Sequence, residues 1–293
     1  MIFLEIAKND LLQYQETLKN QVDLFFVYHS VDAEVRQLFP VTSNVFYKAT
    51  IGNNTLHIVY RKNLYTMSHI MLSVSSGHTF TDDQLNEIFE AFLSKNPELK
   101  TQQSMIFKGA ECVTAQFTTW IKERVKVGGS IKENPCVYYY MNSEQIELTK
   151  NHEFNLPDGY SFCDDISQED ALLINSTWKN AKPGDEIQTA ARIKYLPFAC
   201  IKKNSQPVSY VIYDSCGTLN HLYTDANHRQ LGLGLAVELR ASQKVIQLNR
   251  VPSKLIEQFN HTFLSSTNKG KYWTCWRENN NDPINYLVNV CYP

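Results

Sequence analysis

The stretch best suited to chemistry is "NHRQLGLGLAVELRA", residues 227–241, which places Arg229, Gly232 and Gly234 at the start of an expected helix. A glycine there costs about 1 kcal/mol relative to alanine, so its presence indicates a need for bare backbone. The stretch follows "TLNHLYT", an alternating run typical of a strand. A strand that enters such a turn before a helix gathers main-chain N–H groups at the positive end of the helix dipole. The pattern predicts an anion site, and a diphosphate fits it because adjacent phosphates accept from successive amides, with Arg229 fixing the helix start or adding charge.

The turn matches neither of two common nucleotide-binding motifs. No Gly-Lys-Ser/Thr follows it, and "GLG" lacks both a third glycine and an acidic strand end about 20 residues further on. The alternative interpretation is a plain loop whose glycines let a helix pack closely on a sheet.

Composition limits the classes of protein that fit. The chain has 293 residues, 43% of them hydrophobic, which is ample for packed cores, and a prior of ~150 residues per domain predicts two domains. The net charge is −2 and the basic residues are scattered, so we expect neither nucleic acid nor a membrane surface as a partner. Seven cysteines without a CxxC pair favour a reducing compartment, and no metal site is expected.

Targeting signals are also absent from the pattern. No segment approaches the ~18 apolar residues of a membrane helix, and "MIFLEIAKND" lacks a basic start followed by an apolar run. The expected location is therefore cytoplasmic.

The first half shows a regular order of elements. A helix over about 10–19 precedes four runs with strand character, and Thr81 caps a later amphipathic helix that ends before Pro97. The runs 44–50 and 55–61, which are joined by "IGNN", are typical of a hairpin. The four runs are 22–30, 44–50, 55–61 and 68–76; a strand at 104–107, a helix over about 110–125 and a strand at 136–141 complete the half.

The second half repeats this order after a polar run that we place at the domain boundary. Ser167 caps a helix, with Asp170 three residues on. The expected strands are 153–162, 197–203, 207–214, 218–224, 252–258, 271–276 and 286–292, with helices over 233–248 and from Asn260. We predict an α+β protein with domains 1–145 and 146–293, each a mixed, mostly antiparallel sheet flanked by helices.

The glycine turn resembles motif A of the GNAT superfamily of acyl-CoA-dependent N-acyltransferases, Arg/Gln-x-x-Gly-x-Gly/Ala. Arg229, Gly232 and Gly234 match it, and "LYTDANH" looks like the preceding strand end. The segments "STW", "LPFAC" and "GTLNHLYTDANHR", with a chain end rich in Trp and Cys, are similar to glycine N-acyltransferase and its like-proteins. The likeness covers essentially the whole chain, most strongly 196–276. It implies a tandem GNAT-like fold whose first half has lost the pyrophosphate turn, since "SVSSGHTFTDDQ" lacks the motif, and it adds a mitochondrial location as an alternative.

The resemblance also implies a set of ligand contacts to acyl-CoA or acetyl-CoA as cosubstrate. Main-chain groups of Leu222, Tyr223 and Thr224 would pair with the pantetheine arm and stabilise the oxyanion. Asn260 would touch the pantetheine or adenine end, a role compatible with capping its helix. The pyrophosphate would lie on Arg229, Gln230, Leu231, Gly232, Leu233, Gly234 and Leu235.

The general base is the difficulty. Relatives carry a glutamate at the start of the strand before the turn, where this chain has Thr218. A water relay or another residue must then deprotonate the amine, or the activity has changed. His221 is the nearest titratable substitute, because its ordinary pKa of ~6.5 suits a base. Strand alternation places it on the face opposite Thr218, so a structural histidine packed on a helix is the alternative.

Other candidates are open to two interpretations. Thr267 stands where many relatives have the tyrosine that acts as acid, and Tyr272 is the nearest alternative or a core residue. Arg192 could bind an acceptor carboxylate near Trp178, or be an exposed helix arginine. Asp225, His228 and Cys275 read as turn and core residues.

The sequence thus predicts an N-acyltransferase that transfers the acyl group from a CoA thioester to the amine of a small acceptor, glycine or another amino acid, by direct attack. The alternative is a catalytically inactive protein of the same fold that binds acyl-CoA as a sensor or interaction module.

Overall fold

The computed structural model describes residues 1–102, 104–124, 129–182, 184–277 and 282–292. The strands of the first half are β1 (Ile2–Glu5), β2 (Thr42–Ile51), β3 (Asn54–Asn63), β4 (Ser68–Val74), β5 (Met105–Ala110) and β6 (Ile131–Tyr140). The strands of the second half are β7 (Tyr160–Phe162), β8 (Phe198–Lys203), β9 (Gln206–Tyr213), β10 (Thr218–Thr224), β11 (Ser253–Glu257), β12 (Thr274–Cys275) and β13 (Asn285–Cys291). The helices are α1 (Leu11–Leu18), α2 (Phe25–Val35), α3 (Asp82–Lys95), α4 (Glu111–Arg124), α5 (Ser143–Lys150), α6 (Gln168–Ser176), α7 (Asp185–Tyr195), α8 (Leu233–Gln247) and α9 (His261–Lys269).

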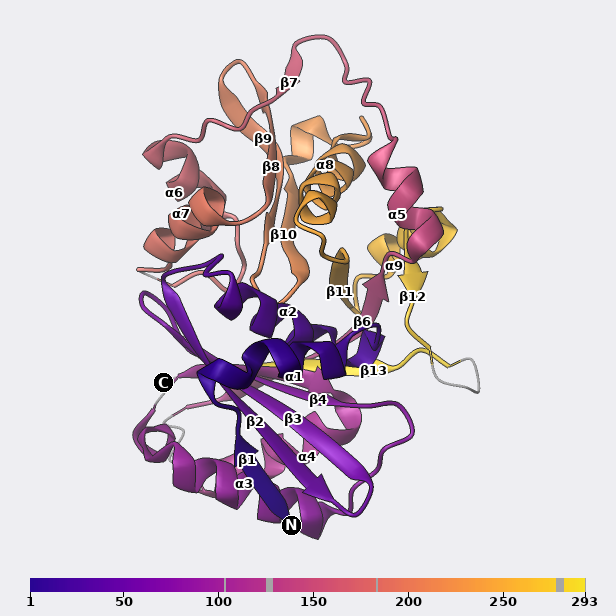
Figure 1. Ribbon diagram of the computed structural model, residues 1–293. Helices are drawn as coiled ribbons and strands as arrows, with labels where there is room; N and C mark the ends of the chain where they lie inside the picture. Colours follow the sequence, from indigo (N-terminus) through magenta and orange to yellow (C-terminus); the bar gives the residue numbers. More distant parts are fainter. Residues whose placement is uncertain (103, 125–128, 183, 278–281, 293) are drawn as a thin grey trace.

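The two halves repeat one pattern. In the first, β2, β3 and β4 are antiparallel, and α3 connects β4 to the parallel strand β5. In the second, β8, β9 and β10 are antiparallel, and α8 connects β10 to the parallel strand β11. Figure 1 shows the halves stacked, with α6 and α7 on one face of the strands β8, β9 and β10 and α8 on the other. The predicted α+β fold of two similar halves is confirmed.

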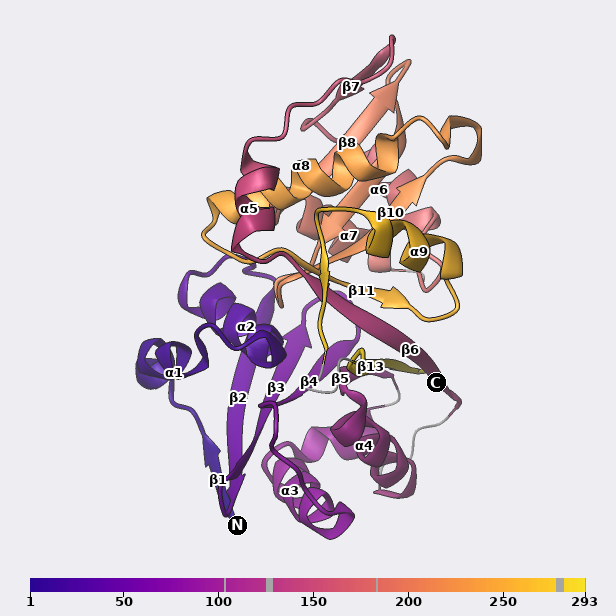
Figure 2. The ribbon, with the colours of Figure 1, turned by 90° about the vertical axis from the view of Figure 1, so that its right-hand side faces the viewer.

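The halves also exchange strands, so that one sheet runs through the described part of the chain. Its order is β1-β2-β3-β4-β5-β13-β6-β11-β10-β9-β8-β7, with β12 also on β6. β13, from the end of the chain, lies between β5 and β6 of the first half. β6 in turn pairs with β11 of the second half and extends from one half to the other in Figure 2. β6 and β13 therefore each pair with strands of the other half. The division into domains 1–145 and 146–293 stays a prediction.

The prediction of a strand over 22–30 is wrong, because these residues form a short 3₁₀ turn and then α2. Phe25, Phe26, Val27 and Val31 are all buried, so the helix is apolar on several sides. A helix covered all round shows no amphipathic period, and a short apolar run does not distinguish it from a buried strand.

The structure differs from the sequence prediction in three further places: it contains one helix that was not predicted, and two of its strands are shorter than predicted. The polar run after residue 142 contains α5, which Asn142 begins with a capping box. The strand expected at 153–162 is confined to Tyr160–Phe162, and that at 271–276 to Thr274–Cys275. The predicted caps at Thr81 and Ser167 are both confirmed as capping boxes.

Candidate functional site

The central feature of the second half is a gap between β10 and β11. These parallel strands pair only at Thr218 with Ser253 and at Leu219 with Lys254, and then diverge. The matching strands of the first half, β4 and β5, stay paired over five positions, from Ser68 to Leu72. Beyond Leu219 the edge of β10 that faces β11 is therefore open to a ligand, whereas the equivalent edge of β4 is closed.

A β-bulge marks the start of the open edge. His221 has a φ of 49°, and the register with β9 shifts between Asn220 and Tyr223. Leu219 packs in the core around α8, but His221 contacts Thr177 and Tyr210 on the α6 side. The predicted alternation, which separated His221 from Thr218, is wrong here, because the bulge turns His221 to the face that Thr218 and Asn220 share.

The glycine turn has a left-handed backbone conformation at two positions. Gly232 begins α8 with a φ of 75°, and Gln230 has a φ of 63°. Among the described residues, no hydrogen bond uses the main-chain N–H groups of 230–235. Arg229 donates from Nε to the carbonyl of Thr224 at 3.0 Å, which anchors the turn to the end of β10. The predicted amides thus lie together at the start of α8 without a hydrogen-bond partner among the described residues.

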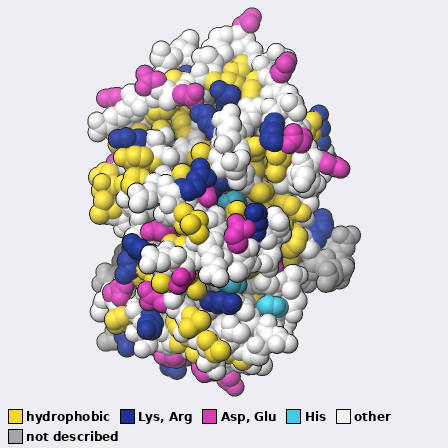
Figure 3. Space-filling view, viewed as in Figure 1, with side chains coloured by type: hydrophobic (Ala, Val, Ile, Leu, Met, Phe, Trp, Pro, Cys, Tyr) yellow, Lys and Arg dark blue, Asp and Glu magenta, His cyan; other side chains and the backbone are white. Residues whose placement is uncertain are grey.

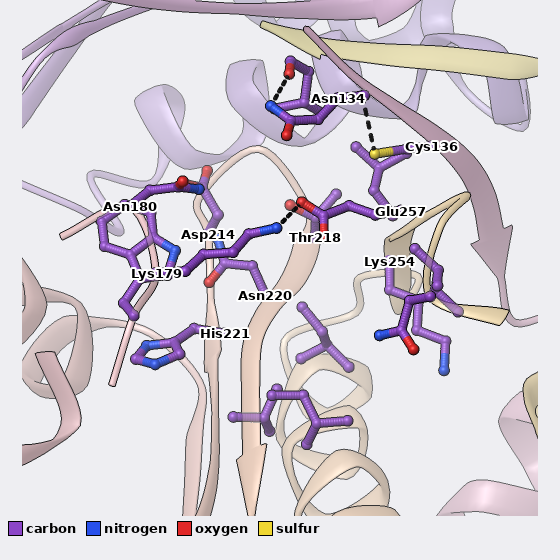
Figure 4. Close-up of a pocket in the computed structure, with 18 of the residues that line it drawn as sticks. Asn134, Cys136, Lys179, Asn180, Asp214, Thr218, Asn220, His221, Lys254 and Glu257 are labelled. Carbon is purple, nitrogen blue, oxygen red and sulfur yellow. Dashed lines mark hydrogen bonds and ion pairs between the residues drawn. The ribbon is translucent and has the colours of Figure 1, made fainter. Parts of the chain in front are cut away.

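A cleft of about 500 Å³ extends along the gap. Figure 4 shows residues of both halves around it, and side chains from β5, β6, β10 and β11 line it together with the segment after α6. The polar and charged lining residues are His69, Lys108, Asn134, Thr177, Lys179, Asn180, Arg192, Asp214, Thr218, Asn220, His221, Glu238, Lys254, Glu257 and Asn260.

The floor of the cleft carries buried positive charge. Asp214 follows β9, and its carboxylate contacts Arg61 Nη1 at 2.7 Å and Arg192 Nη2 at 3.3 Å. Burial alone raises the pKa of Asp214, but Arg61, Lys108 and Arg192 outweigh it and hold that pKa well below its ordinary value. Lys108 Nζ lies 3.0 Å from Cys216 Sγ. Three buried basic side chains thus surround one buried carboxylate. The excess positive charge would favour a bound anion.

Arg192 corrects one expectation. It is 5% exposed rather than an exposed helix residue, and it lines the cleft beside the ring of Trp178. Trp178 and Arg192, both predicted near the acceptor pocket, are therefore brought together.

His221 is a partly buried side chain in the cleft wall. Burial, together with the charge of Arg192, lowers its pKa to about 4. Its Nε2 lies 3.0 Å from Thr177 Oγ1, which also contacts the Tyr210 hydroxyl at 2.7 Å. Thr218, at the position of the expected glutamate, is 3% exposed, and its hydroxyl lies 3.6 Å from Cys216 Sγ.

On the α8 side of the sheet, the cleft contains a second buried ion pair. Lys254 Nζ contacts Glu238 Oε1 at 2.7 Å and Thr267 Oγ1 at 3.3 Å. Trp273 Nε1 donates to Glu238 Oε2 at 3.0 Å. Sequence reasoning did not single out Lys108 or Lys254; the signal was a lone lysine within an apolar strand run, "SMIFKGA" and "PSKLIE".

The remaining candidates are placed as follows. Asn260 caps α9 by accepting from Phe263 N and also lines the cleft, so its two predicted roles are compatible. The Tyr272 hydroxyl contacts His152 Nδ1 at 3.0 Å, outside the set of cleft-lining residues. Asp225 caps the short turn before Arg229, His228 contacts the Tyr160 hydroxyl, and Cys275 lies on β12.

Two other kinds of feature are absent from the described residues. No helix there has the length and apolar character to span a membrane, and no three His, Cys, Asp or Glu side chains group as metal ligands. On the face seen in Figure 3, basic and acidic side chains are mixed rather than gathered into one basic patch.

The class of fold follows from comparison with solved structures. A Drosophila protein aligns over 99% of this chain and 98% of its own, with a TM-score of 0.73 at 13% identity. A tandem GNAT protein from the clavulanic acid biosynthesis pathway aligns over 99% and 97%, with a TM-score of 0.51 at 12% identity. A GCN5-related N-acetyltransferase from Sphaerobacter thermophilus aligns over 99% and 96%, with a TM-score of 0.50 at 8% identity.

The chain therefore has a tandem GNAT-like fold. Neither protein-family models nor curated proteins match the sequence, so the likeness is one of structure.

Proposed function

We propose that this protein is an acyl-CoA-dependent N-acyltransferase that acts on a small amine, glycine or another amino acid. The observation that supports this most directly is the open edge of β10, which begins at Leu219 and leads to the glycine turn before α8. An acyl-CoA has a diphosphate towards one end and a thioester at the other. The diphosphate would lie at the glycine turn, and the arm that carries the thioester would extend along the gap between β10 and β11.

The donor half of the proposed site is built from main chain. The amides of 230–235, with Arg229 beside them, would hold the pyrophosphate. Leu222, Tyr223 and Thr224 would pair with the pantetheine arm along the open edge, and Asn260 would contact it from α9. A main-chain N–H on this edge would stabilise the oxyanion that forms from the thioester carbonyl.

The acceptor half is supported by the charge on the cleft floor. Arg192 and Lys108 are buried, and together with Arg61 they exceed the single negative charge of Asp214. A carboxylate on the acceptor would neutralise the excess. The amine of the same molecule would then attack the thioester directly, without a covalent enzyme intermediate.

One observation favours a second candidate, a protein that binds acyl-CoA without turnover. Thr218 is buried at the position where related enzymes carry a catalytic glutamate, and its hydroxyl does not replace a carboxylate. Such a protein would keep the donor half of the site and act as a sensor or interaction module.

Two measurements separate these functions. Calorimetry with CoA and a series of acyl-CoAs tests the donor site, and release of free CoA is followed with glycine, other amino acids, glycinamide and methylamine. The proposed enzyme binds CoA and releases it with amino acids much faster than with amines that lack a carboxylate. Binding without release for any amine leaves the sensor function, and absence of binding contradicts both.

A further inference from the structure

The cleft contains three carboxylates among its described lining residues, Asp214, Glu238 and Glu257. Asp214 is 1% exposed, and each of its oxygens contacts an arginine. Its pKa lies well below the ordinary value, because the neighbouring positive charges outweigh the effect of burial. Such a carboxylate is too weak a base to take a proton from an ammonium group.

Glu238 is fully engaged on the other side of the sheet. Its Oε1 accepts from Lys254 and its Oε2 from Trp273, and the side chain is 5% exposed. If Glu238 moved away from Lys254 to act as a base, the buried ammonium of Lys254 would lose its counter-charge, at a cost of several kcal/mol.

Glu257 differs from both in position and exposure. It ends β11, three residues after Lys254, which is the last residue of β11 that pairs with β10. Ile256 packs in the core around α8, so Glu257 faces the opposite side of the sheet. This is the side that Thr218, Asn220 and His221 share, and the Glu257 side chain is 25% exposed.

The carboxylate of Glu257 already contacts an ammonium group inside the cleft. Lys179, from the segment after α6, pairs with Glu257 Oε1, and Figure 4 shows the two side chains meeting across the cleft. Lys179 is 46% exposed and reaches Glu257 from a segment outside the sheet, so an incoming ammonium can replace it. The Nζ of Lys179 marks the place where an acceptor amine would lie.

His221 also lies on this face, and it is less suited to the task. Its Nε2 is occupied by Thr177, and burial lowers its pKa to about 4. Further titratable or charged groups that line the cleft are the Cys136 thiol of β6, directly opposite Glu257 on the neighbouring strand, the group of His69, Lys108, Arg192 and Asp214, and the Glu238–Lys254 pair on the α8 side.

We infer that Glu257 is the general base of the proposed acyl transfer, supplied by β11 in place of the glutamate that β10 lacks. This rests on the proposed function. Glu257 takes one proton from the acceptor ammonium, and the free amine forms a bond to the thioester carbon. The tetrahedral intermediate then breaks its C–S bond, and the CoA thiolate takes the second proton from the nitrogen. The products are an amide and CoA thiol, and Glu257 releases its proton to solvent.

The test compares Glu257→Gln with a matched control, Glu133→Gln. Glu133 also lies on a strand and pairs with a lysine, Lys122 at 3.3 Å, but it is not among the residues that line the cleft. Glu257→Gln is expected to lower kcat by about 10²- to 10⁴-fold, the range for loss of a general base. Glu133→Gln should leave kcat unchanged, and CoA affinity by calorimetry should be the same in both.

The pH profile separates a base from a structural residue. With Glu257→Gln, only acceptor that is already deprotonated reacts, so kcat/KM should rise about tenfold per pH unit below the amine's pKa. Glu257→Asp, which keeps a carboxylate, should recover part of kcat. A Glu257→Gln variant with the kcat and pH profile of the unsubstituted chain overturns the role of Glu257 while acyl transfer stands. Absence of turnover by the unsubstituted chain overturns both.

Discussion

Arg192 on α7 reaches Asp214 at the end of β9, with Nη2 3.3 Å from Oδ2, while Arg61 of the first half holds the other oxygen at 2.7 Å. This shared carboxylate joins the two halves beneath the cleft. All three residues are 5% exposed or less, so neither arginine can be hydrated in place of its partner.

Asp214→Asn is therefore expected to destabilise the protein by about 3–5 kcal/mol, because it leaves two buried guanidinium groups without a counter-charge. Urea unfolding measures the free energy change. Glu16→Gln is the control, since Glu16 forms an exposed pair with Lys19 and should cost under about 1 kcal/mol. Equal effects of the two variants would show that the buried pair contributes little.

The glycine turn gives a test of ligand binding with a matched backbone control. Gly232 and Gly77 both have a positive φ, 75° and 80°, and a Cβ at either would meet open space. Gly232→Leu and Gly77→Leu should therefore lose similar stability, about 1–2 kcal/mol each. Only Gly232→Leu places a side chain where the diphosphate would lie, so we expect at least tenfold weaker CoA binding by calorimetry for that variant alone. Equal CoA affinities would place the anion elsewhere.

Gly109 keeps the equivalent gap of the first half closed. A Cβ there would lie 2.1 Å from the carbonyl oxygen of Leu72 on the paired strand β4, a distance that requires the strands to move apart. Gly109→Ala should lower the free energy of unfolding by about 3 kcal/mol, as overpacking does. Gly270→Ala, with its nearest contact at 3.3 Å, is the comparison and should cost under about 1 kcal/mol. A tolerated Gly109→Ala would mean that β4 and β5 separate easily.

Buried histidines predict a loss of stability in mild acid. Burial lowers the pKa of His57 to about 3 and that of His221 to about 4, and His29 and His69 also titrate well below the ordinary value. Between about pH 6.5 and 4 the unfolded chain binds protons that the folded chain refuses, so stability rises with pH and falls as pH drops. Each such histidine contributes a slope of about 1.4 kcal/mol per pH unit. Urea unfolding at several pH values should show the decline, with a shallower slope for His221→Gln; a flat profile contradicts it.

Local sequence was sufficient for most elements and for the turn. The caps at Thr81 and Ser167 were readable because each cap and its partner lie three residues apart. Arg229, Gly232 and Gly234 predicted the turn before α8 because the backbone conformation there depends on those residues themselves. Most strands were predicted along the chain from short apolar or alternating runs, but the run 22–30 forms α2 instead.

Tertiary structure alone determined which residues share the cleft. The bulge at His221 and the early end of pairing at Leu219 depend on neighbouring strands, and no local period encodes them. Lys108 on β5 lowers the pKa of Asp214 after β9 only because the halves exchange β6 and β13 and join in one sheet. A buried charge such as that of Lys108 or Asp214 is stable only when an opposite charge lies close by. Because these two residues are about a hundred residues apart along the chain, the local sequence does not show that they come together.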